Sequence, residues 1–262
     1  MCAVCFSAPV KSNIGAKGIE YIDGETAIPT AADYVQDGLV AMWDGIENAG
    51  WGVHDDEAIV WKDLVGDLDL RCNRTPVWNR DEAVISGWNT YFYAVADSIS
   101  EAFNNHSVTV EILYGSVITA ANNSGPFGIG DSSFSQVWPV YVQQNRAANT
   151  ACNIVMLGQS TWQPSSWFLG RGNGENYHIA ISVEGSVIGA RSISPDGIWF
   201  SEYKNASFSS QIEYGSIFSI GRSYNHQMPG WCVRCVRVYD RAISDREMQY
   251  NHKIDNLRFN LP

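Results

Sequence analysis

The last fifth of the chain places two apolar segments and a capped helix in close succession. Residues 215–224 read GSIFSIGRSY, and residues 230–239 read GWCVRCVRVY. Both begin at a glycine and are rich in β-branched and aromatic residues, which is typical of strands bounded by turns. Ser244 follows with Glu247 three residues later, the spacing of a capping box at the start of a helix. The segment therefore predicts a strand, a turn, a second strand and a short C-terminal helix.

Segments with strand character recur along the rest of the chain, separated by turn residues. Apolar residues alternate with polar ones in 107–114, and the turn Glu184-Gly185 joins two apolar runs into a hairpin. The terminal helix, ending near residue 252, is the one helix that we expect. The expected further strands are 39–44, 59–65, 107–114, 136–143, 177–183 and 186–191. This pattern predicts an all-β fold, a two-sheet antiparallel β-sandwich with one short C-terminal helix.

Both ends of this pattern resemble a known family. The closing segment carries Ile220-Gly221-Arg222 and then, over residues 236–244, VRVYDRAIS; the opening segment carries WKDLVGD over residues 61–67. These motifs resemble those of the laminin-G-like, concanavalin A-like jelly rolls of bacteria and phages, although Val65 and Asp67 stand where that family usually has Ser and Asn. The resemblance covers about residues 38–259. It implies a jelly roll in which most members bind a ligand and only some catalyse.

The N-terminal residues lack a regular pattern. Three glycines and Pro29 interrupt the first 33 residues, so we expect 1–33 to be an N-terminal arm or attachment segment. We expect 34–262 to form the laminin-G-like jelly-roll domain, since all-β sandwiches of this length occur as single units.

Charge and hydropathy exclude several classes of partner. The net charge of −11 argues against nucleic acid, because a phosphate backbone requires a basic face. No run of 18 apolar residues occurs, so we expect no membrane insertion. Residues 1–10 lack the basic region and the apolar core of a signal peptide. These features leave a protein retained in the cell that makes it, one released by another route, or one whose signal has been removed.

Six cysteines include two Cys-x-x-Cys pairs, at Cys2/Cys5 and Cys232/Cys235. Two such pairs could form a four-thiolate zinc site. Residues three apart on a strand point to opposite faces, however, and the second pair lies on an expected strand. We therefore interpret the cysteines as free thiols.

Catalytic constellations are weak in this sequence. The resemblance implies a comparison with laminarinase-type glycosidases, which carry paired carboxylates in a Glu-x-Asp-x-x-Glu strand. The corresponding strand here offers Glu111 alone, with Thr109 and Leu113 on the same face, and retaining hydrolysis needs two carboxyl groups about 5 Å apart. We therefore expect the chain not to be an enzyme, with a divergent glycoside hydrolase as the weaker alternative.

Acidic residues gather in the Gly-rich loop after the first expected strand. Calcium prefers a cage of about six to eight oxygen atoms, and Asp44, Glu47, Asp55 and Asp56 are the candidate ligands. The alternative is an ordinary solvated acidic loop. Ca²⁺ is the one cofactor for which the sequence offers candidates.

Aromatic residues in the middle third offer a surface for a sugar. The apolar C–H faces of sugars stack on Trp and Tyr rings, while polar side chains orient the hydroxyl groups. For each single Trp, packing in the core is the alternative. The candidate ligand-binding residues are Trp138, Tyr141, Trp162, Gln163, Trp167, Tyr177 and Trp199.

These observations favour a recognition or adhesion module that binds a glycan or another cell-surface ligand. The resemblance suggests a phage virion component, such as a fibre, spike or capsid decoration, located on a virion or extracellular surface. Residues 1–33 would then contact other virion subunits, and the module would form a homo-oligomer within an assembly. A purely structural virion or assembly subunit that binds no sugar is the alternative.

Overall fold

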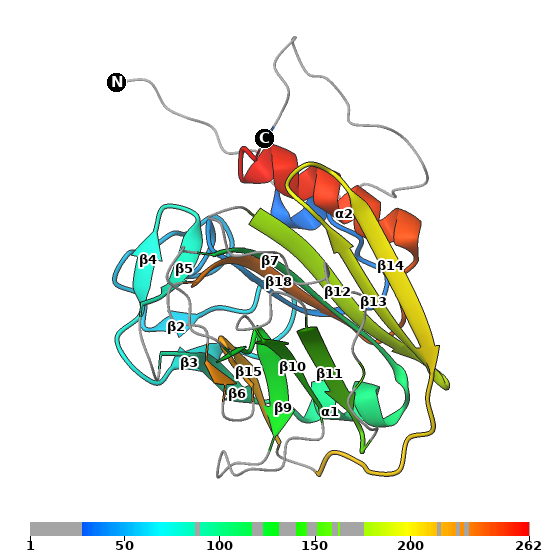
Figure 1. Ribbon diagram of the computed structural model, residues 1–262. Helices are drawn as coiled ribbons and strands as arrows, with labels where there is room; N and C mark the ends of the chain where they lie inside the picture. Colours follow the sequence, from blue (N-terminus) through cyan, green and yellow to red (C-terminus); the bar gives the residue numbers. More distant parts are fainter. Residues whose placement is uncertain are drawn as a thin grey trace, which may run out of the picture.

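The structure is a computed structural model. It describes residues 28–86, 90–116, 123–130, 140–145, 151–158, 162, 176–213, 216–223, 226–227 and 231–261. Within these residues, two antiparallel sheets face each other and one long helix lies across the outside of one of them (Figure 1). The predicted all-β, two-sheet antiparallel sandwich with a C-terminal helix is confirmed.

The first sheet has the strand order β14-β13-β12-β7-β18-β5-β4, and β1 also pairs with β18. The longest pairing joins β12 to β7, from Asn176 opposite Gly115 to Glu184 opposite Ser107. Its strands are β1 (Leu39–Asp44), β4 (Val77–Asn79), β5 (Glu82–Ile85), β7 (Ser107–Ser116), β12 (Asn176–Glu184), β13 (Val187–Ile193), β14 (Trp199–Asn205) and β18 (Trp231–Tyr239).

The second sheet has the order β11-β10-β9-β15-β6-β3-β2, with β8 paired to β10. Its strands are β2 (Val60–Trp61), β3 (Leu70–Cys72), β6 (Phe92–Val95), β8 (Asn123–Ser124), β9 (Phe127–Gly130), β10 (Val140–Asn145), β11 (Ala151–Met156) and β15 (Ile217–Ile220). Two short strands, β16 (Arg222–Ser223) and β17 (His226–Gln227), pair separately. Several of these strands are too short for their alternation to be visible in the sequence.

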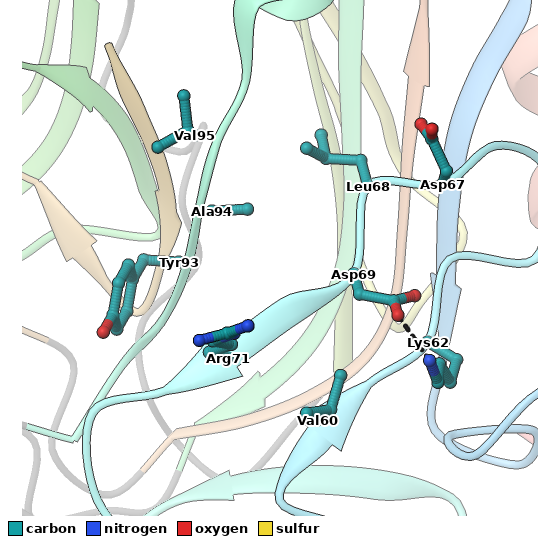
Figure 2. A pocket seen from close by; sticks show the side chains of 9 residues that line it. All are labelled: Val60, Lys62, Asp67, Leu68, Asp69, Arg71, Tyr93, Ala94 and Val95. Atoms are coloured by element: carbon teal, nitrogen blue, oxygen red, sulfur yellow. Dashed lines mark hydrogen bonds and ion pairs between the residues drawn. The ribbon is translucent and has the colours of Figure 1, made fainter. Parts of the chain in front are cut away.

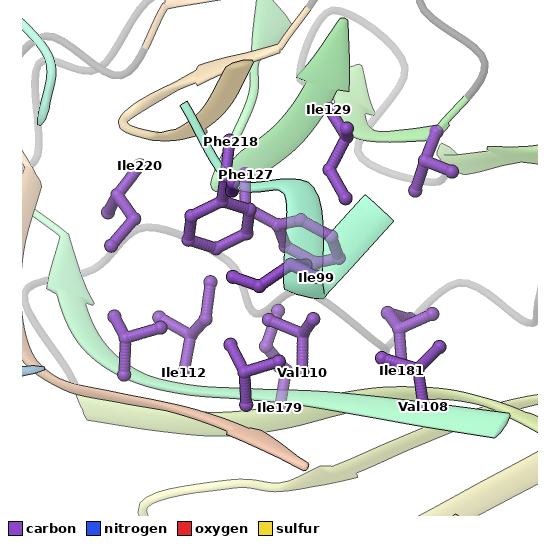
Figure 3. Packing of buried hydrophobic residues seen from close by; sticks show 14 of the residues in the cluster. Ile99, Val108, Val110, Ile112, Phe127, Ile129, Ile179, Ile181, Phe218 and Ile220 are labelled. Carbon is purple, nitrogen blue, oxygen red and sulfur yellow. The ribbon is translucent and has the colours of Figure 1, made fainter. Parts of the chain in front are cut away.

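The core lies between the two sheets, and its side chains come from alternate positions of the facing strands. Residues of β7 and β12 point toward residues of β9 and β15, and Ile99 of α1 (Asp97–Asn104) packs between the layers (Figure 3). All of these side chains are at most 1% exposed; those labelled are Val108, Val110, Ile112, Ile179, Ile181, Phe127, Ile129, Phe218 and Ile220. Burial of apolar area of this kind is the main force that holds two sheets together.

The helical content exceeds the prediction. A 3₁₀ turn η1 (Ala31–Asp33) precedes the first sheet, α1 (Asp97–Asn104) follows β6, and α2 (Asp245–Arg258) follows β18. Ser244 and Glu247 form the predicted capping box, but α2 continues to Arg258 rather than ending near residue 252. The prediction of a single helix was wrong because it omitted α1. The N-cap residue of α1 is Ala96, which makes no side-chain hydrogen bond and so gives no start signal in the sequence.

A bulge in β18 changes the geometry of the second Cys-x-x-Cys pair. The register of β18 against β7 shifts between Val233 and Cys235. Val233 and Val236 both pack in the core, whereas Cys235 packs against the helix side of the sheet. The argument that Cys232 and Cys235 face opposite sides was therefore wrong, since one extra residue in a strand reverses the alternation after it. Both are free thiols, as is Cys72.

The part of the N-terminal segment that the structure describes, residues 28–33, packs on the sandwich. The carbonyl of Pro29 accepts a 2.8 Å hydrogen bond from Arg258 Nη1, and Ala31 is 2% exposed. Residues 1–27 lie outside the described residues, so the arm and its boundary stay a prediction. None of the helices in the described ranges combines the length and the apolar content that crossing a bilayer requires.

A buried ionic network joins α2 to the outer face of the first sheet. Arg237 of β18 is fully buried and donates to Glu111 of β7 and, through both terminal nitrogens, to Asp255 of α2, at 2.8 to 2.9 Å. Tyr34 donates to Asp255 at 2.8 Å, and its ring lies 4.3 Å from the Arg237 guanidinium carbon. Such a bidentate pair satisfies several donors at once and fixes the relative position of the two elements.

Two further side chains complete this network. Asn251 of α2 donates to Glu111 at 2.8 Å, and His178 of β12 lies 3.3 Å from Glu111 and 3.5 Å from Asp255. Burial raises the pKa of Glu111, but the positive charge of Arg237 and the His178 interaction outweigh it, so the net pKa of Glu111 is lowered. Burial opposes ionisation of Asp255 too, yet Arg237 brings its pKa below the usual value. Both carboxylates are therefore ionised in the folded protein.

Substitution of Arg237 by Leu is expected to destabilise the fold by about 3–5 kcal/mol, because it leaves two buried carboxylates without their cation. Arg246→Ala on the exposed face of α2 is the control and should change stability by less than about 0.5 kcal/mol. Urea unfolding of both variants measures the difference. If the Arg237→Leu and Arg246→Ala variants had the same free energy of unfolding, the network would not stabilise the packing of α2 on the sheet.

Stability should fall in acid, beginning near pH 6.5. Burial lowers the pKa of His252 from 6.5 to about 4 in the fold, so the unfolded chain takes up a proton first as the pH falls through this window. Because the pKa values of Glu111 and Asp255 are lowered in the fold, stability falls further at still lower pH, as these carboxylates become protonated. Urea midpoints measured from pH 7 to pH 4 test this, and His252→Gln should flatten the curve. A midpoint independent of pH over that range would contradict it.

Candidate functional site

The second sheet carries a cleft of about 620 Å³ at the end formed by β2, β3 and β6. Polar and apolar side chains from these three strands and from the loop between β2 and β3 meet there (Figure 2). The lining residues are Val60, Lys62, Asp67, Leu68, Asp69, Arg71, Tyr93, Ala94 and Val95.

The pleat of the short strands determines which side chains reach this cleft. Trp61, Leu70 and Phe92 are fully buried in the core. Their neighbours Arg71 and Tyr93 therefore point outward, since successive side chains of a strand alternate between the two faces. The strand register places Arg71 directly opposite Tyr93.

The cleft opens because β3 and β6 separate beyond this pair. Their pairing comprises Arg71 with Tyr93 and Cys72 with Phe92. Beyond it, Ala94 and the segment at Leu68 face each other across an open space (Figure 2). Val95 at the rim is 57% exposed. An apolar wall with polar groups at its edge results, the combination that small-molecule sites usually have.

The loop that forms one wall is shaped by the motif noted in the sequence. Asp63 accepts hydrogen bonds from the backbone N–H groups of Met42, Val65 and Leu68, at 3.0 to 3.1 Å. A Cβ at Gly66 would lie 3.2 Å from the Val40 carbonyl oxygen. The WKDLVGD motif therefore has a structural role here, because it folds the loop that carries Leu68 into the cleft.

Of the two basic side chains in the cleft, one has an acidic partner and the other has none among the described residues. Lys62 is paired with Asp69 through an ion pair of 2.5 Å, and Asp67 points away from Arg71 (Figure 2). Arg71 is exposed, and its guanidinium has no hydrogen-bond or ion-pair partner among the described residues. A free guanidinium presents a planar fork of donors that fits a carboxylate or other planar acceptor.

Tyr93, directly opposite Arg71 in the strand pair, adds an aromatic ring to the lining of the cleft. Its ring lies 5.7 Å from that of Tyr91, and the Arg222 guanidinium lies 4.8 Å from the Tyr91 ring. The Tyr93 ring is thus supported from one side, which restricts its rotamers. The pair of Tyr93 and Arg71 can contact the apolar face and the charged group of one ligand together.

A second cleft, of about 490 Å³, lies beside the start of α2. Its polar groups are largely bonded to one another. Arg241 is paired with Glu247 at 2.6 Å, Tyr203 donates to Asp245 at 2.7 Å, and Ser244 caps the helix. These contacts stabilise the helix start, and they leave few groups for a ligand.

Two predicted ligand-binding residues belong to the core. Trp162 and Tyr177 are each 7% exposed and pack in the main core cluster, so neither ring is open to a sugar. Trp199 is half-buried against the second core cluster, which lies under α2. The assignments of Trp162 and Tyr177 were wrong because Trp and Tyr rings near strand ends fill the space between layers, whereas the assignment of Trp199 stays a prediction.

The other predicted ligand-binding residues are not tested by the structure. Trp138, Gln163 and Trp167 lie outside the described residues. Tyr141 lies on β10, and its backbone belongs to the cross-strand row that runs through Tyr93, Ser219 and Gly128.

The predicted calcium ligands form hydrogen bonds and ion pairs with other residues of the chain. Asp44 is fully buried and accepts from Arg258 Nε at 2.8 Å, while Glu47 accepts from Arg258 Nη2 at 2.9 Å. Burial raises the pKa of Asp44, and Arg258 partly offsets this. Asp55 caps the backbone N–H of Glu57.

Asp56, the fourth predicted calcium ligand, lies 3.0 Å from His54. No group of three or more potential metal ligands occurs within the described ranges. The Arg258 guanidinium is thus paired with Asp44 and Glu47, two of the predicted calcium ligands. The structure does not test calcium binding by this loop.

The residues that line the cleft were missed from the sequence. Arg71 lies on a three-residue strand and Tyr93 on a four-residue strand, both shorter than the windows in which alternation is recognisable. The run YFYAV at 91–95 is the one signal that could have located β6.

The chain is similar to known proteins in fold but not in sequence. No family model matches the sequence, and no curated protein sequence resembles it significantly. The laminin-G-like family therefore remains a prediction.

Among solved structures, a mutant of Trypanosoma rangeli sialidase with trans-sialidase activity matches with a TM-score of 0.58 at 14% identity, over 87% of this chain and 34% of that one. The same sialidase in complex with sialic acid gives 0.55 at 15% identity, over 88% of this chain and 34% of that one. The binding domain of botulinum neurotoxin DC in complex with SialylT gives 0.56 at 9% identity, covering 85% and 52% of the two chains. The chain thus spans about a third of the sialidases, and at these identities the likeness shows the fold alone.

These matches correct one prediction. The expectation that the chain is not an enzyme is contradicted by the matches to sialidases, because the fold also occurs within chains that are enzymes. Glu111, the carboxylate considered for catalysis, lies in the buried network with Arg237 rather than in the cleft.

Because Arg258 already neutralises Asp44 and Glu47, we expect calcium chloride to leave the thermal unfolding temperature unchanged. Binding to the folded state alone would raise it in proportion to ligand excess. Calorimetry with calcium and with a chelator makes the comparison, and the Asp55→Asn, Asp56→Asn double variant is the control. A rise that this variant abolishes would establish the calcium site.

Proposed function

We propose that this protein recognises a glycan through the cleft that Arg71 and Tyr93 line on the second sheet. The observation that carries the proposal is the exposed guanidinium of Arg71, free of any partner among the described residues, directly opposite an aromatic residue. Tyrosine rings bind the C–H faces of sugars, and guanidinium groups bind carboxylates. A carboxylate-bearing sugar is the ligand class that uses both.

The structural neighbours support this choice of ligand class. One is a sialidase in complex with sialic acid, and another is a toxin binding domain in complex with SialylT. Sialic acid carries a carboxylate on a sugar ring, so it is the first ligand to test. The chain has a net charge of −11, which disfavours acidic ligands elsewhere on its surface. A local, unpaired cation is therefore needed for this ligand.

Hydrolysis is a second candidate activity, favoured by the sialidase matches. Every binding experiment on this cleft should therefore include a measurement of released sialic acid. The laminin-G-like assignment, the virion or cell-surface location and the contacts of residues 1–33 with other virion subunits extend the proposal, and they rest on the sequence motifs alone.

Sialyllactose is expected to bind the full chain, and lactose to bind more weakly. Arg71→Ala should raise the Kd for sialyllactose by tenfold or more, because a hydrogen bond to a charged group contributes about 1.5–3 kcal/mol. Arg71→Lys should recover part of the loss, since it keeps the charge without the planar fork. Isothermal titration calorimetry measures all of these affinities.

Arg80→Ala is the matched control, because Arg80 is also exposed on a neighbouring turn but lies outside the cleft. It should leave the affinity unchanged. Equal affinities for sialyllactose and lactose, or an affinity that Arg71→Ala does not alter, would contradict the proposal.

A further inference from the structure

The loop between β1 and β2 presents an exposed indole at its tip. Trp51 is 54% exposed, whereas the other Trp residues in the described ranges are buried or half-buried. Trp is among the most costly side chains to leave in water, because its burial removes a large apolar area. Neither the core nor the cleft at Arg71 uses this residue.

The tip is a tight turn. Val53 donates to the Gly50 carbonyl at 2.9 Å, and Ala49 donates to the Val53 carbonyl at 3.2 Å. Gly50 has a φ of +121° and Gly52 a φ of +69°, conformations that suit glycine. A Cβ at either glycine would meet no atom within 4 Å. The glycines thus serve the backbone of the turn, and they leave the space beside Trp51 open.

The loop is also fixed from below. Glu47 accepts from the Gly52 N–H at 3.1 Å with one carboxylate oxygen and from Arg258 of α2 at 2.9 Å with the other. Asn48 and Asp55 exchange two hydrogen bonds across the base of the loop, at 2.8 and 2.9 Å. A side chain on such a loop is held in position before a ligand arrives, which lowers the entropy cost of binding.

The exposed apolar area and the charges around Trp51 indicate which kind of ligand can bind there. A stable protein partner needs about 800 Å² on each side. Beside Trp51, the strongly exposed large apolar residues that the structure describes on this loop are Val53, at 50%, and Ile59, at 68%, too few for such an area. An anionic membrane is disfavoured because residues 45–57 contain no Lys or Arg, while Asp55, Asp56 and Glu57 are exposed. The same carboxylates repel acidic sugars and can accept hydrogen bonds from hydroxyl groups.

We propose that Trp51 forms a second binding site, which stacks against the C–H face of an uncharged sugar ring with loop carboxylates as hydroxyl acceptors. One indole matches one sugar ring in area, and the rigid turn presents it without reorganisation. The site is separate from the cleft at Arg71 and differs from it in ligand charge. It does not depend on the glycan recognition proposed for that cleft.

The experiment follows the indole N–H signals of ¹⁵N-labelled full-length protein by NMR. Trp51→Ala identifies the Trp51 signal by its loss. Methyl glycosides of glucose, galactose, mannose and N-acetylglucosamine are then titrated separately. At least one should shift the Trp51 signal saturably, and Trp51→Ala should raise its Kd by about tenfold, the value of one aromatic stack. Trp51→Phe should retain part of the affinity.

Two controls separate this site from others. Tyr250→Ala removes an exposed ring from α2 and should leave the titration unchanged. Arg71→Ala should also leave it unchanged, so failure of the cleft and failure of this site give different results. The proposal is overturned if none of the four glycosides shifts the Trp51 signal, if the affinity survives Trp51→Ala, or if anionic vesicles shift it instead.

Discussion

The contact between Arg237 and the two carboxylates of Glu111 and Asp255 is the interaction on which the remaining structure depends. It connects β18, β7 and α2 through charged groups that are fully buried. A carboxylate pair without its cation would be strongly destabilising, so these groups tolerate only one arrangement of helix on sheet. The helix therefore covers part of the outer face of the first sheet, and the polar groups of the cleft beside it are largely bonded to one another.

The same helix also fixes the position of the loop between β1 and β2. Arg258 near the end of α2 binds Asp44 at the end of β1 and Glu47 within the loop. These ion pairs therefore fix the position of the loop relative to α2. The helix organises one end of the molecule, while the second sheet carries the cleft at β2, β3 and β6, which no helix of the described residues covers.

Long elements could be predicted from the sequence, and short ones could not. β1, β7, β18 and the β12–β13 hairpin are apolar-rich segments of six or more residues per strand, and the Ser244 capping box marks α2. α1 lacks a cap, and β3 and β6 are too short for alternation to appear. The roles of Trp162 and Tyr177 were misjudged because composition does not distinguish a ring between two sheets from one facing water. The pairing of Asp44 with Arg258, 214 residues apart, has no local signal.

A crystal structure of the full chain grown or soaked with sialyllactose tests most directly the proposed binding of a carboxylate-bearing sugar at Arg71 and Tyr93. We expect the sugar carboxylate to lie within hydrogen-bonding distance of the Arg71 guanidinium, with the sugar ring against Tyr93. Sialyllactose bound at another place, or a cleft that stays free of sugar at saturating concentration, would contradict it.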